Sequence, residues 1–428
     1  MNILIRGSRV VDPVTGTDEV KDIYIENGLI SAVGTEAGDR AALASREDLR
    51  VIEGEGLVTA PGLMDAHVHF RDPGQTWKED IETGAAAAAH GGFTTVVCMA
   101  NTIPAVDNPE VLNMNLEKGQ KTGIRMLQAS TVTQGMMGEK LVDMEAMKNA
   151  GAAGFTDDGK PIMDEKLLLE ACREAARLDL PISLHEEDPL FIHGAGVNAG
   201  PIAEKLGYGG AEAAAEDVLT ARDCMIALET GAPMVIQHIS SKGAVEAVRM
   251  AKKLGAQVYA EATPHHFTLT EDDVLKYGTN ARMNPPLRTA EDRSGIIEGL
   301  KDGTIDMIVT DHAPHSTEEK AKAMDKAPSG ITGLETSLSL GILSLVEPGH
   351  LTLLQLIDKM STAPAKIYRR KPVSIAPGNE ADLVIFGEKE RYTVSWYASK
   401  SRNTPFTGWE LPGKVHMTIC GGKIIYED

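Results

Sequence analysis

The 428-residue sequence predicts an α/β protein, in which a TIM-type (β/α)8 barrel is joined to a small β-sandwich domain built from both chain ends. Three observations favour this fold. Between residues 60 and 370, apolar β-rich runs alternate with Ala- and Leu-rich helical stretches, a pattern typical of parallel sheets. There are eight such runs, the number of strands in a TIM barrel. Both chain ends contain short β-type runs with hairpin signals.

The hairpin signals lie at Asn27-Gly28 and at Gly421-Gly422, each between apolar runs. Such turns need positive φ at both central residues, which Asn and Gly tolerate. Because each chain end is too small to bury a core alone, the two ends are expected to pack together. We therefore predict a discontinuous β-sandwich domain of residues 1–58 plus 371–428, and a barrel domain of residues 59–370.

The eight barrel strands are predicted at residues 62–69, 94–99, 125–131, 154–157, 181–185, 234–238, 257–262 and 306–310. Helical patterns fall between them, for example at residues 79–90, 165–178, 211–229 and 243–254. Two segments, residues 191–210 and 316–328, are expected to be loops. The second follows the last strand, so it is interpreted either as a cover for a site or as a solvated surface loop.

Composition excludes several classes of partner. Asp and Glu number 62 against 42 Lys and Arg, so the formal net charge of −20 opposes binding to nucleic acid or anionic lipid. The four cysteines are scattered without a Cys-x-x-Cys spacing and are expected to be free, buried thiols. No signal segment or membrane-spanning apolar run is present, so we expect a cytoplasmic protein.

The candidate functional residues follow the predicted strands. His67 and His69 are two residues apart on the first strand, so both side chains project from the same face. The carboxyl ends of barrel strands build the active site. Six further residues end other strands, and they are Asp157, Asp158, His185, His238, Asp311 and His315. Histidines and carboxylates gathered at one mouth indicate a metal centre.

Imidazole and carboxylate ligands without thiolate suit Zn²⁺, with Mn²⁺ or Co²⁺ as substitutes. The expected ligands are His67, His69, Asp158, His185, His238 and Asp311. Six ligands exceed what one catalytic zinc takes, so two zinc ions bridged by a carboxylate and a hydroxide are predicted. The implied chemistry is that of a dinuclear hydrolase.

The order of these residues, in a barrel flanked by a split β domain, resembles the metal-dependent amidohydrolase superfamily. Within it, the sequence looks like the dihydroorotases of the bacterial, stand-alone type. The motifs that carry this resemblance are residues 67–74 (HVHFRDPG), 101–102 (NT), 155–159 (FTDDG), 284–288 (NPPLR) and 310–315 (TDHAPH), and it spans nearly the whole chain.

The resemblance implies reversible hydrolysis of a cyclic amide, the interconversion of L-dihydroorotate and N-carbamoyl-L-aspartate in pyrimidine synthesis. A metal-bound hydroxide would attack the ring carbonyl, with Asp311 as general base and then general acid. Many amidohydrolases have a carboxylated lysine between the metals, whereas this chain has Asp157-Asp158-Gly159. The bridging role falls on Asp157 or Asp158, and the family's spacing to His185 favours Asp158.

The resemblance also assigns substrate contacts. The guanidinium of Arg71 suits bidentate binding of the substrate carboxylate. Asn101 and His315 would complete this anion pocket, while Asn284 and the backbone at Ser329 and Gly330 would hydrogen-bond the ring amide groups. His265 and His266 are interpreted as helix-start or supporting residues.

Two alternatives are kept. The chain could be a hydantoinase- or allantoinase-type hydrolase, although those relatives usually keep the bridging lysine. It could instead be a non-catalytic subunit that supports aspartate transcarbamoylase, although such a subunit would be expected to lose metal ligands. A homodimer is expected, and association with aspartate transcarbamoylase is also conceivable for an active enzyme.

Overall fold

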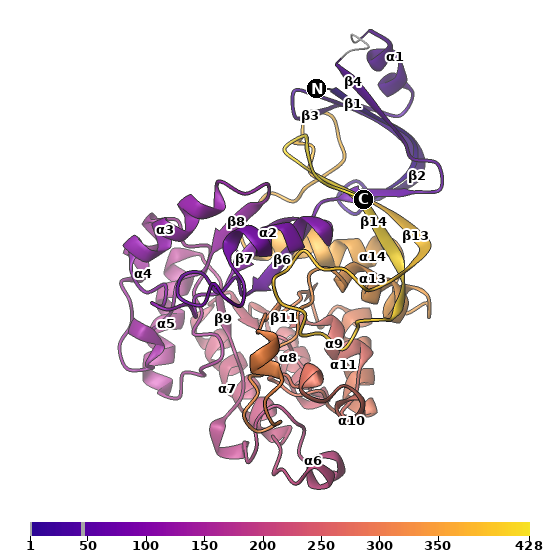
Figure 1. Ribbon diagram of the computed structural model, residues 1–428. Coiled ribbons are helices and arrows are strands. Elements are labelled where there is room, and N and C mark those ends of the chain that lie inside the picture. Colours follow the sequence, from indigo (N-terminus) through magenta and orange to yellow (C-terminus); the bar gives the residue numbers. More distant parts are fainter. Residues whose placement is uncertain (1, 44–47) are drawn as a thin grey trace.

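The computed structural model describes residues 2–43 and 48–428. A barrel surrounded by helices lies below a β-sheet domain in the view of Figure 1, and the two ends of the chain meet in that sheet domain. Of the described residues, none belongs to a helix long and apolar enough to cross a bilayer.

The barrel strands form two parallel sheets. The first contains β6 (Leu63–Val68), β7 (Phe93–Cys98) and β8 (Arg125–Gln128), and the second contains β9 (Ile182–Leu184), β10 (Met234–Ile236), β11 (Val258–Ala262) and β12 (Met307–Ile308). Isolated bridges join the two sheets in a ring. They connect Ser130 with Phe155, Phe155 with Ile182, and Val68 with His312. The eight-membered arrangement predicted from the sequence is therefore present.

The predicted fourth strand is reduced to the bridge residue Phe155. Hydrogen bonds still join this position to the chain on both sides. Phe155 N–H donates to Pro181 O, and Thr156 N–H donates to Ser130 O. The chain then turns, and Lys160 N–H donates to Asp157 O at 2.9 Å. The strand is short because the turn that carries the two aspartates begins immediately after it.

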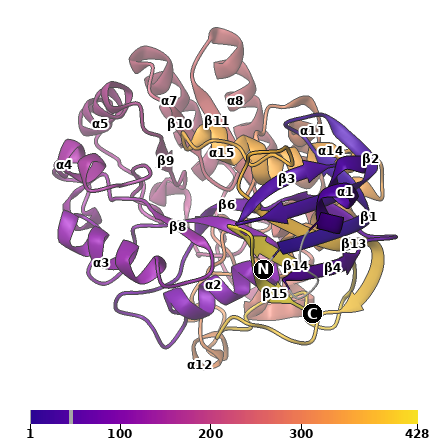
Figure 2. The same ribbon diagram turned by 90° about the horizontal axis from the view of Figure 1, so that it is seen from above.

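Helices cover the outside of the barrel, as Figure 2 shows for α3, α4, α5, α7 and α8. The outer helices are α2 (Ile81–His90), α3 (Pro109–Gly119), α4 (Met144–Asn149), α5 (Glu165–Leu178), α7 (Ala214–Thr230), α8 (Lys242–Leu254) and α11 (Ala290–Asp302), and they have between 6 and 17 residues. In α5, Leu168, Ala171, Cys172, Ala175 and Leu178 are buried. Their spacing of three and four residues places them on one face, against the strands.

Short helices complete the chain. They are α1 (Thr35–Leu43), α6 (Pro201–Leu206), α9 (Pro264–Thr268), α10 (Asp273–Tyr277), α12 (Thr317–Lys320), α13 (Ser337–Gly341), α14 (Leu353–Ile357) and α15 (Ala363–Ile367). Two of them, α6 and α12, lie in segments predicted as loops. Each is only one or two turns long, too short to produce a periodic apolar pattern.

The sheet domain is an eight-stranded sheet with the order β15-β14-β13-β5-β1-β2-β3, and β4 pairs with β1. Its strands are β1 (Asn2–Asp12), β2 (Thr17–Glu26), β3 (Leu29–Val33), β4 (Leu49–Glu53), β5 (Val58–Pro61), β13 (Leu383–Thr393), β14 (Glu410–Cys420) and β15 (Lys423–Glu427). Ile3, Ile25, Leu383 and Ile419 belong to one hydrophobic cluster, so the two chain ends share a core. The division at residues 58 and 370 stays a prediction.

Both predicted hairpins are confirmed. Asn27 and Gly28 connect β2 to β3 with φ of 53° and 81°, and Gly421 and Gly422 connect β14 to β15 with φ of 57° and 73°. Strand β5 is the link between the halves of the sheet, because it pairs with both β1 and β13. Only Gly62 separates β5 from the first barrel strand, β6.

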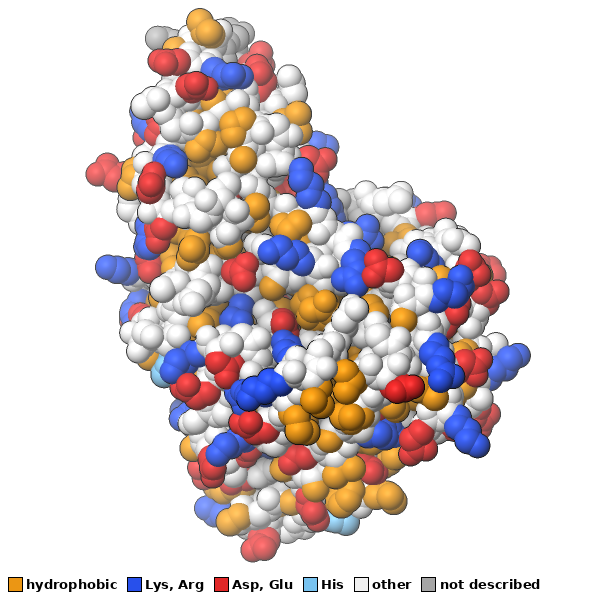
Figure 3. All heavy atoms as spheres, turned by 180° about the vertical axis from the view of Figure 1, so that it is seen from behind, with side chains coloured by type: hydrophobic (Ala, Val, Ile, Leu, Met, Phe, Trp, Pro, Cys, Tyr) orange, Lys and Arg blue, Asp and Glu red, His pale blue; other side chains and the backbone are white. Residues whose placement is uncertain are grey.

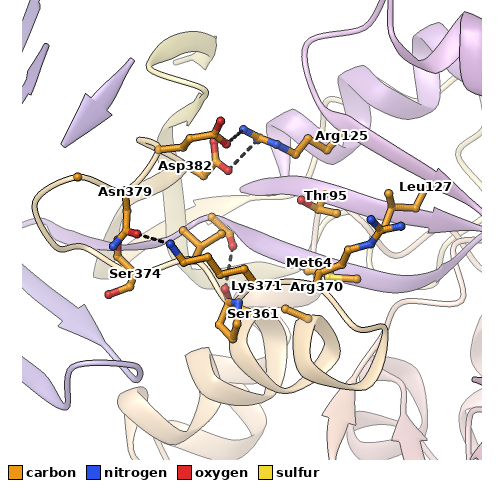
Figure 4. A pocket seen from close by; sticks show the side chains of 16 residues that line it. Met64, Thr95, Arg125, Leu127, Ser361, Arg370, Lys371, Ser374, Asn379 and Asp382 are labelled. Carbon is orange, nitrogen blue, oxygen red and sulfur yellow. Dashed lines mark hydrogen bonds and ion pairs between the residues drawn. The ribbon is translucent and has the colours of Figure 1, made fainter. Parts of the chain in front are cut away.

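A cavity of about 370 Å³ lies where the sheet domain meets the start of strands β6 to β8. Figure 4 shows its polar border, in which Arg125 pairs with Asp382 at 2.7 Å and with Glu380 at 2.5 Å, and Lys371 donates to Asn379. Its lining contains no histidine. This cavity is therefore a junction between the sheet domain and the barrel, at the opposite end of the strands from the predicted metal ligands.

Candidate active site

Strand β6 and the residue just beyond it bring His67 and His69 to the mouth of the barrel. Both side chains are buried. His69 Nε2 lies 3.0 Å from Asp311 Oδ1 and 3.5 Å from Asp158 Oδ2. His67 Nε2 lies 3.5 Å from a carboxylate oxygen of each of the same two aspartates. Two residues apart on a strand, the two imidazoles face one pair of carboxylates.

Asp158 lies at the centre of the cluster. One of its oxygens is 3.9 Å from His185 Nδ1 and 3.9 Å from His238 Nε2, and these two nitrogens are 3.0 Å apart. Asp157 has a different environment, because it accepts hydrogen bonds from Val132 N–H at 2.8 Å and from Thr133. Its carboxylate is therefore occupied by the preceding loop, whereas that of Asp158 faces the histidines.

The donor atoms form three overlapping sets, each within 4.8 Å. The sets are His67, His69 and Asp158; His67, His238 and Asp311; and Asp158, His185 and His238. His67 Nε2 has no hydrogen-bond partner among the described residues although it is fully buried. An unsatisfied buried nitrogen is costly, so its position among carboxylates fits a metal ion.

Neighbouring acceptors orient three of these histidines. His67 Nδ1 lies 3.0 Å from Glu261 Oε2, His69 Nδ1 lies 2.9 Å from Asn101 Oδ1, and His185 Nε2 lies 2.9 Å from Glu187 Oε2. Since each of these oxygens can only accept, each ring donates its N–H outward. The lone pair of the other ring nitrogen then faces the cluster, as metal ligation requires.

Sequence reasoning missed Glu261 and Glu187. A signal for Glu261 was available, because it is an acidic residue inside the apolar run Val258–Ala262 that forms β11. An acid in a buried strand needs a partner.

Asn101, predicted as a substrate contact, lines the cavity and also donates to Asp158 Oδ2 at 2.9 Å. It therefore connects a predicted ligand on strand 1 with one after strand 4.

The charges of the central groups follow from burial and from each other. Burial opposes ionisation of Asp158, but His67 and His238 hold its pKa well below the usual carboxyl value. Burial likewise opposes ionisation of Asp311, and His67 and His69 lower its pKa. Both aspartates are therefore carboxylates at neutral pH, ready to act as ligands or as a base.

A cavity of about 350 Å³ opens beside these residues and contains the predicted substrate contacts. Of the twelve predicted site residues, Gly330 and His67 do not line it directly; those that do are His69, Arg71, Asn101, Asp158, His185, His238, Asn284, Asp311, His315 and Ser329. Arg71 Nε donates to Pro314 O at 3.3 Å. No described residue engages the two terminal nitrogens of its guanidinium, which remain available to an anion.

The remaining predicted contacts form the wall opposite the histidines. Ser329 Oγ donates to Asn284 Oδ1 at 3.0 Å, and His315 Nε2 lies 2.8 Å from Ser329 O. Gly330 N–H donates to Arg282 O. A Cβ at Gly330 would lie 2.6 Å from Ala313 O and 2.7 Å from the His315 ring. A glycine is therefore required for the backbone to pass so close to His315.

His265 and His266 lie in α9, outside the three donor sets. His266 contacts Thr263 Oγ1 and Pro285 O, while burial lowers the pKa of His265 to about 3. These contacts agree with the supporting role expected of them. The four cysteines are free and buried, as predicted.

Known proteins share both the sequence and the architecture of this chain. Residues 58–425 match the model of the amidohydrolase family. Dihydroorotase from Clostridioides difficile is 56% identical over 99% of both chains, and dihydroorotase from Clostridium acetobutylicum is 50% identical over the full length of both. The chain belongs to the dihydroorotases of the amidohydrolase family. The resemblance noted in its sequence motifs is therefore confirmed.

Solved structures with the same architecture include two hydantoinases. L-hydantoinase from Arthrobacter aurescens superimposes with a TM-score of 0.86 at 24% identity, covering 99% of this chain and 96% of that one. D-hydantoinase from Thermus sp. gives a TM-score of 0.84 at 25% identity, covering 100% and 95%. At this identity, the likeness shows the barrel and sheet fold. The chain is 50–56% identical to the two dihydroorotases but only 24–25% identical to the two hydantoinases, so the hydantoinase alternative is not favoured.

Proposed function

We propose that this protein catalyses the reversible interconversion of L-dihydroorotate and N-carbamoyl-L-aspartate in de novo pyrimidine biosynthesis. One observation carries the proposal: a cluster of histidines and aspartates shares a cavity with the free guanidinium of Arg71. The substrate combines a hydrolysable ring amide with a carboxylate. The 56% identity to the dihydroorotase of Clostridioides difficile, over 99% of both chains, supports the same proposal.

We propose two Zn²⁺ ions as the cofactor, held by His67, His69, Asp158, His185, His238 and Asp311. Asp158 belongs to two of the three donor sets, which supports it rather than Asp157 as the bridging ligand. When bound, the metals would activate water and polarise the carbonyl that is attacked. If both ions used this carboxylate, binding of the second would depend on the first.

Asp311 is the proposed proton carrier. Its low pKa keeps it ionised, and its Oδ1 lies 3.0 Å from His69 Nε2, at the edge of the cavity. As a carboxylate it can accept a proton from the attacking water. It can then deliver that proton to the amide nitrogen that leaves the ring carbonyl, which returns it to the ionised form.

Arg71 is the proposed carboxylate anchor, with Asn101 and His315 beside it. Two parallel N–H donors match the two oxygens of a carboxylate and would fix the orientation of the ring. Asn284 and the backbone at Ser329 and Gly330 would hydrogen-bond the ring amide groups. Positioning the ring in this way holds the scissile bond near Asp311.

The test is a comparison of substrates on the purified chain. Zinc content is measured first, and hydrolysis is then followed with dihydroorotate, hydantoin and allantoin at equal concentrations. We expect about two zinc ions per chain and turnover of dihydroorotate well above that of the other two. Faster turnover of hydantoin would contradict the substrate assignment, and inactivity of the zinc-loaded chain on all three would contradict an enzymatic role.

We further propose a cytoplasmic homodimer, which could also associate with aspartate transcarbamoylase. Four free cysteines fit a reducing compartment. The charge of −20 disfavours nucleic-acid partners, and the face seen in Figure 3 carries acidic and basic side chains intermixed. Light scattering of the chain alone and mixed with aspartate transcarbamoylase would test both assemblies.

A further inference from the structure

Lys78 is a buried cation that the proposed reaction does not use. It follows β6 by ten residues, and its side chain is only 7% exposed. Lysine is rarely buried this deeply unless its charge is compensated. Its ammonium lies 3.1 Å from Glu319 Oε1 and 3.3 Å from His315 Nδ1. It therefore connects the loop after strand 1 with two residues after strand 8.

The contacts of His315 define which ring nitrogen carries its proton. His315 Nε2 lies 2.8 Å from Ser329 O, and a carbonyl can only accept, so Nε2 carries the hydrogen. The ammonium of Lys78 can only donate, so Nδ1 must present its lone pair to it. Both neighbours require the same neutral tautomer. Burial, followed by Arg71 and Lys78, lowers the pKa of His315 to about 2, which agrees with a neutral ring.

Glu319 keeps Lys78 in place. Its Oε2 accepts from Ser316 N–H at 3.0 Å, so the carboxylate is part of the capping box at the start of α12. Its other oxygen faces Lys78. The capping box fixes the carboxylate of Glu319, which compensates the charge of Lys78 and lies 3.8 Å from His315 Nδ1.

The far end of this chain of contacts is the wall of the substrate cavity. Ser329 lines the cavity, and its carbonyl is the acceptor of His315. A Cβ at Gly330 would lie 2.7 Å from the His315 ring, so the backbone at Gly330 passes close to this imidazole. Without the Lys78 ammonium, Nδ1 would face Glu319 Oε2, which lies 3.8 Å away and favours a proton on Nδ1. Only the Ser329 carbonyl would then favour the Nε2–H tautomer, and the ring would be divided between the two forms.

We propose that Lys78 is a positioning residue that fixes His315 as the Nε2–H tautomer and thereby holds the Ser329–Gly330 backbone for substrate binding. The proposal deepens the dihydroorotate assignment and rests on it. Lys78 itself touches neither the proposed metal ligands nor the reacting bond. Its effect should therefore fall on substrate binding more than on the chemical step.

The kinetic test replaces Lys78 with methionine, which keeps the length of the side chain and removes its charge. In zinc-loaded enzyme we expect KM for dihydroorotate to rise about tenfold or more, the scale of one lost charged hydrogen bond, with kcat within about threefold of wild type. Lys78→Arg should recover part of the loss. The matched control is Lys326→Met, which removes a lysine that is 74% exposed and lies in the segment that also contains Glu319. It should change neither constant.

A spectroscopic test needs no substrate. Long-range ¹⁵N–¹H spectra of histidine-labelled protein report which ring nitrogen is protonated, and the His315 signals are assigned by their loss in His315→Gln. We expect the Nε2–H pattern in the wild type and a mixed or Nδ1–H pattern in Lys78→Met. Protonation on Nδ1 in the wild type would overturn the proposal even if every variant failed to fold.

The two tests separate this inference from the proposed function. A wild-type enzyme inactive on dihydroorotate would refute the substrate assignment, while the tautomer measurement would still stand by itself. An active wild type with an unchanged KM in a folded Lys78→Met variant would refute the role of Lys78 alone.

Discussion

Individual residues in this site owe their chemistry to their neighbours. Asp157 and Asp158 are adjacent in the sequence, yet one accepts backbone N–H groups of the preceding loop and the other faces four histidines. Because the backbone of the preceding loop holds the carboxylate of Asp157, it cannot take the place of Asp158 among the histidines. The same principle applies to Asp311, whose ionised state depends on the histidines beside it.

Substitution of Asp311 by asparagine tests its role as proton carrier. The amide keeps the shape and one ligand oxygen but cannot accept a proton, so we expect kcat for dihydroorotate to fall by roughly 10² to 10⁴. Zinc content should stay near that of the wild type, measured by atomic emission. A variant that retained zinc and most of its turnover would contradict the assignment.

The low pKa of His315 predicts an acid sensitivity. The unfolded chain has a histidine pKa near 6.5, so between pH 6.5 and about 2 the unfolded state binds more protons and stability falls as pH falls. At pH 5, His315 alone should lower the free energy of unfolding by about 2 kcal/mol relative to its value at high pH. We expect His315→Gln to lose less unfolding free energy than wild type between pH 7 and pH 5, measured by urea titration.

The control for this comparison is His193→Gln, which removes a histidine whose side chain is 56% exposed. Its pH dependence should match the wild type. Equal losses in all three proteins would mean that His315 is protonated in the native state at pH 5.

At the scale of elements, long and periodic segments could be predicted and short ones could not. The helical pattern predicted at residues 165–178 matches the bounds of α5. The turns predicted at Asn27-Gly28 and at Gly421-Gly422 both form hairpins. The fourth strand shrank to Phe155, and α6 and α12 arose in predicted loops. Their limits are set by local contacts, such as the capping box between Ser316 and Glu319 and the turn from Asp157 to Lys160, and not by an apolar period.

The segment after strand 8 offers a prediction about glycine. Gly330→Ala places a Cβ 2.6 Å from Ala313 O, so the backbone must shift away from His315. We expect a loss of roughly 1 to 3 kcal/mol of unfolding free energy, together with a higher KM for dihydroorotate. Gly200 has a similar φ of 145° but open space around it, so Gly200→Ala shares the backbone strain without the contact. Equal costs at both sites would contradict the steric explanation.

At the scale of the whole molecule, the strand ends could be predicted to converge because barrel geometry requires it. The residues that orient the site histidines could not, since Glu261 meets His67, and Lys78 meets His315, only in three dimensions. Glu187 is close to His185 in the sequence, but it is one of three consecutive acidic residues, and only the structure shows which of them contacts the ring. The residue pattern alone leaves open which of the two adjacent aspartates turns inward, and only the family resemblance favoured Asp158. The predicted ligands thus depend on the fold, and the fold is expected to depend on them.

Metal removal should therefore destabilise the entire protein. The cluster gathers buried carboxylates and imidazoles, and an ion that binds only the native state adds roughly 2.7 kcal/mol per site at 100 times its Kd. We expect chelation to lower the melting temperature and zinc to restore it, measured by differential scanning fluorimetry. Asp158→Asn should reduce the bound zinc and weaken this response. An unchanged melting temperature after verified zinc removal would contradict the coupling.

Strand β5 has a consequence for the order in which the molecule is made. It pairs with β13, yet more than 300 residues separate Pro61 from Leu383. At translation rates of about 5 to 20 residues per second, β5 leaves the ribosome roughly 15 to 60 s before its partner. The barrel can assemble in that interval, while the N-terminal strands wait with an unpaired edge. The edge of β5 is thus exposed to aggregation in the newborn chain until β13 pairs with it.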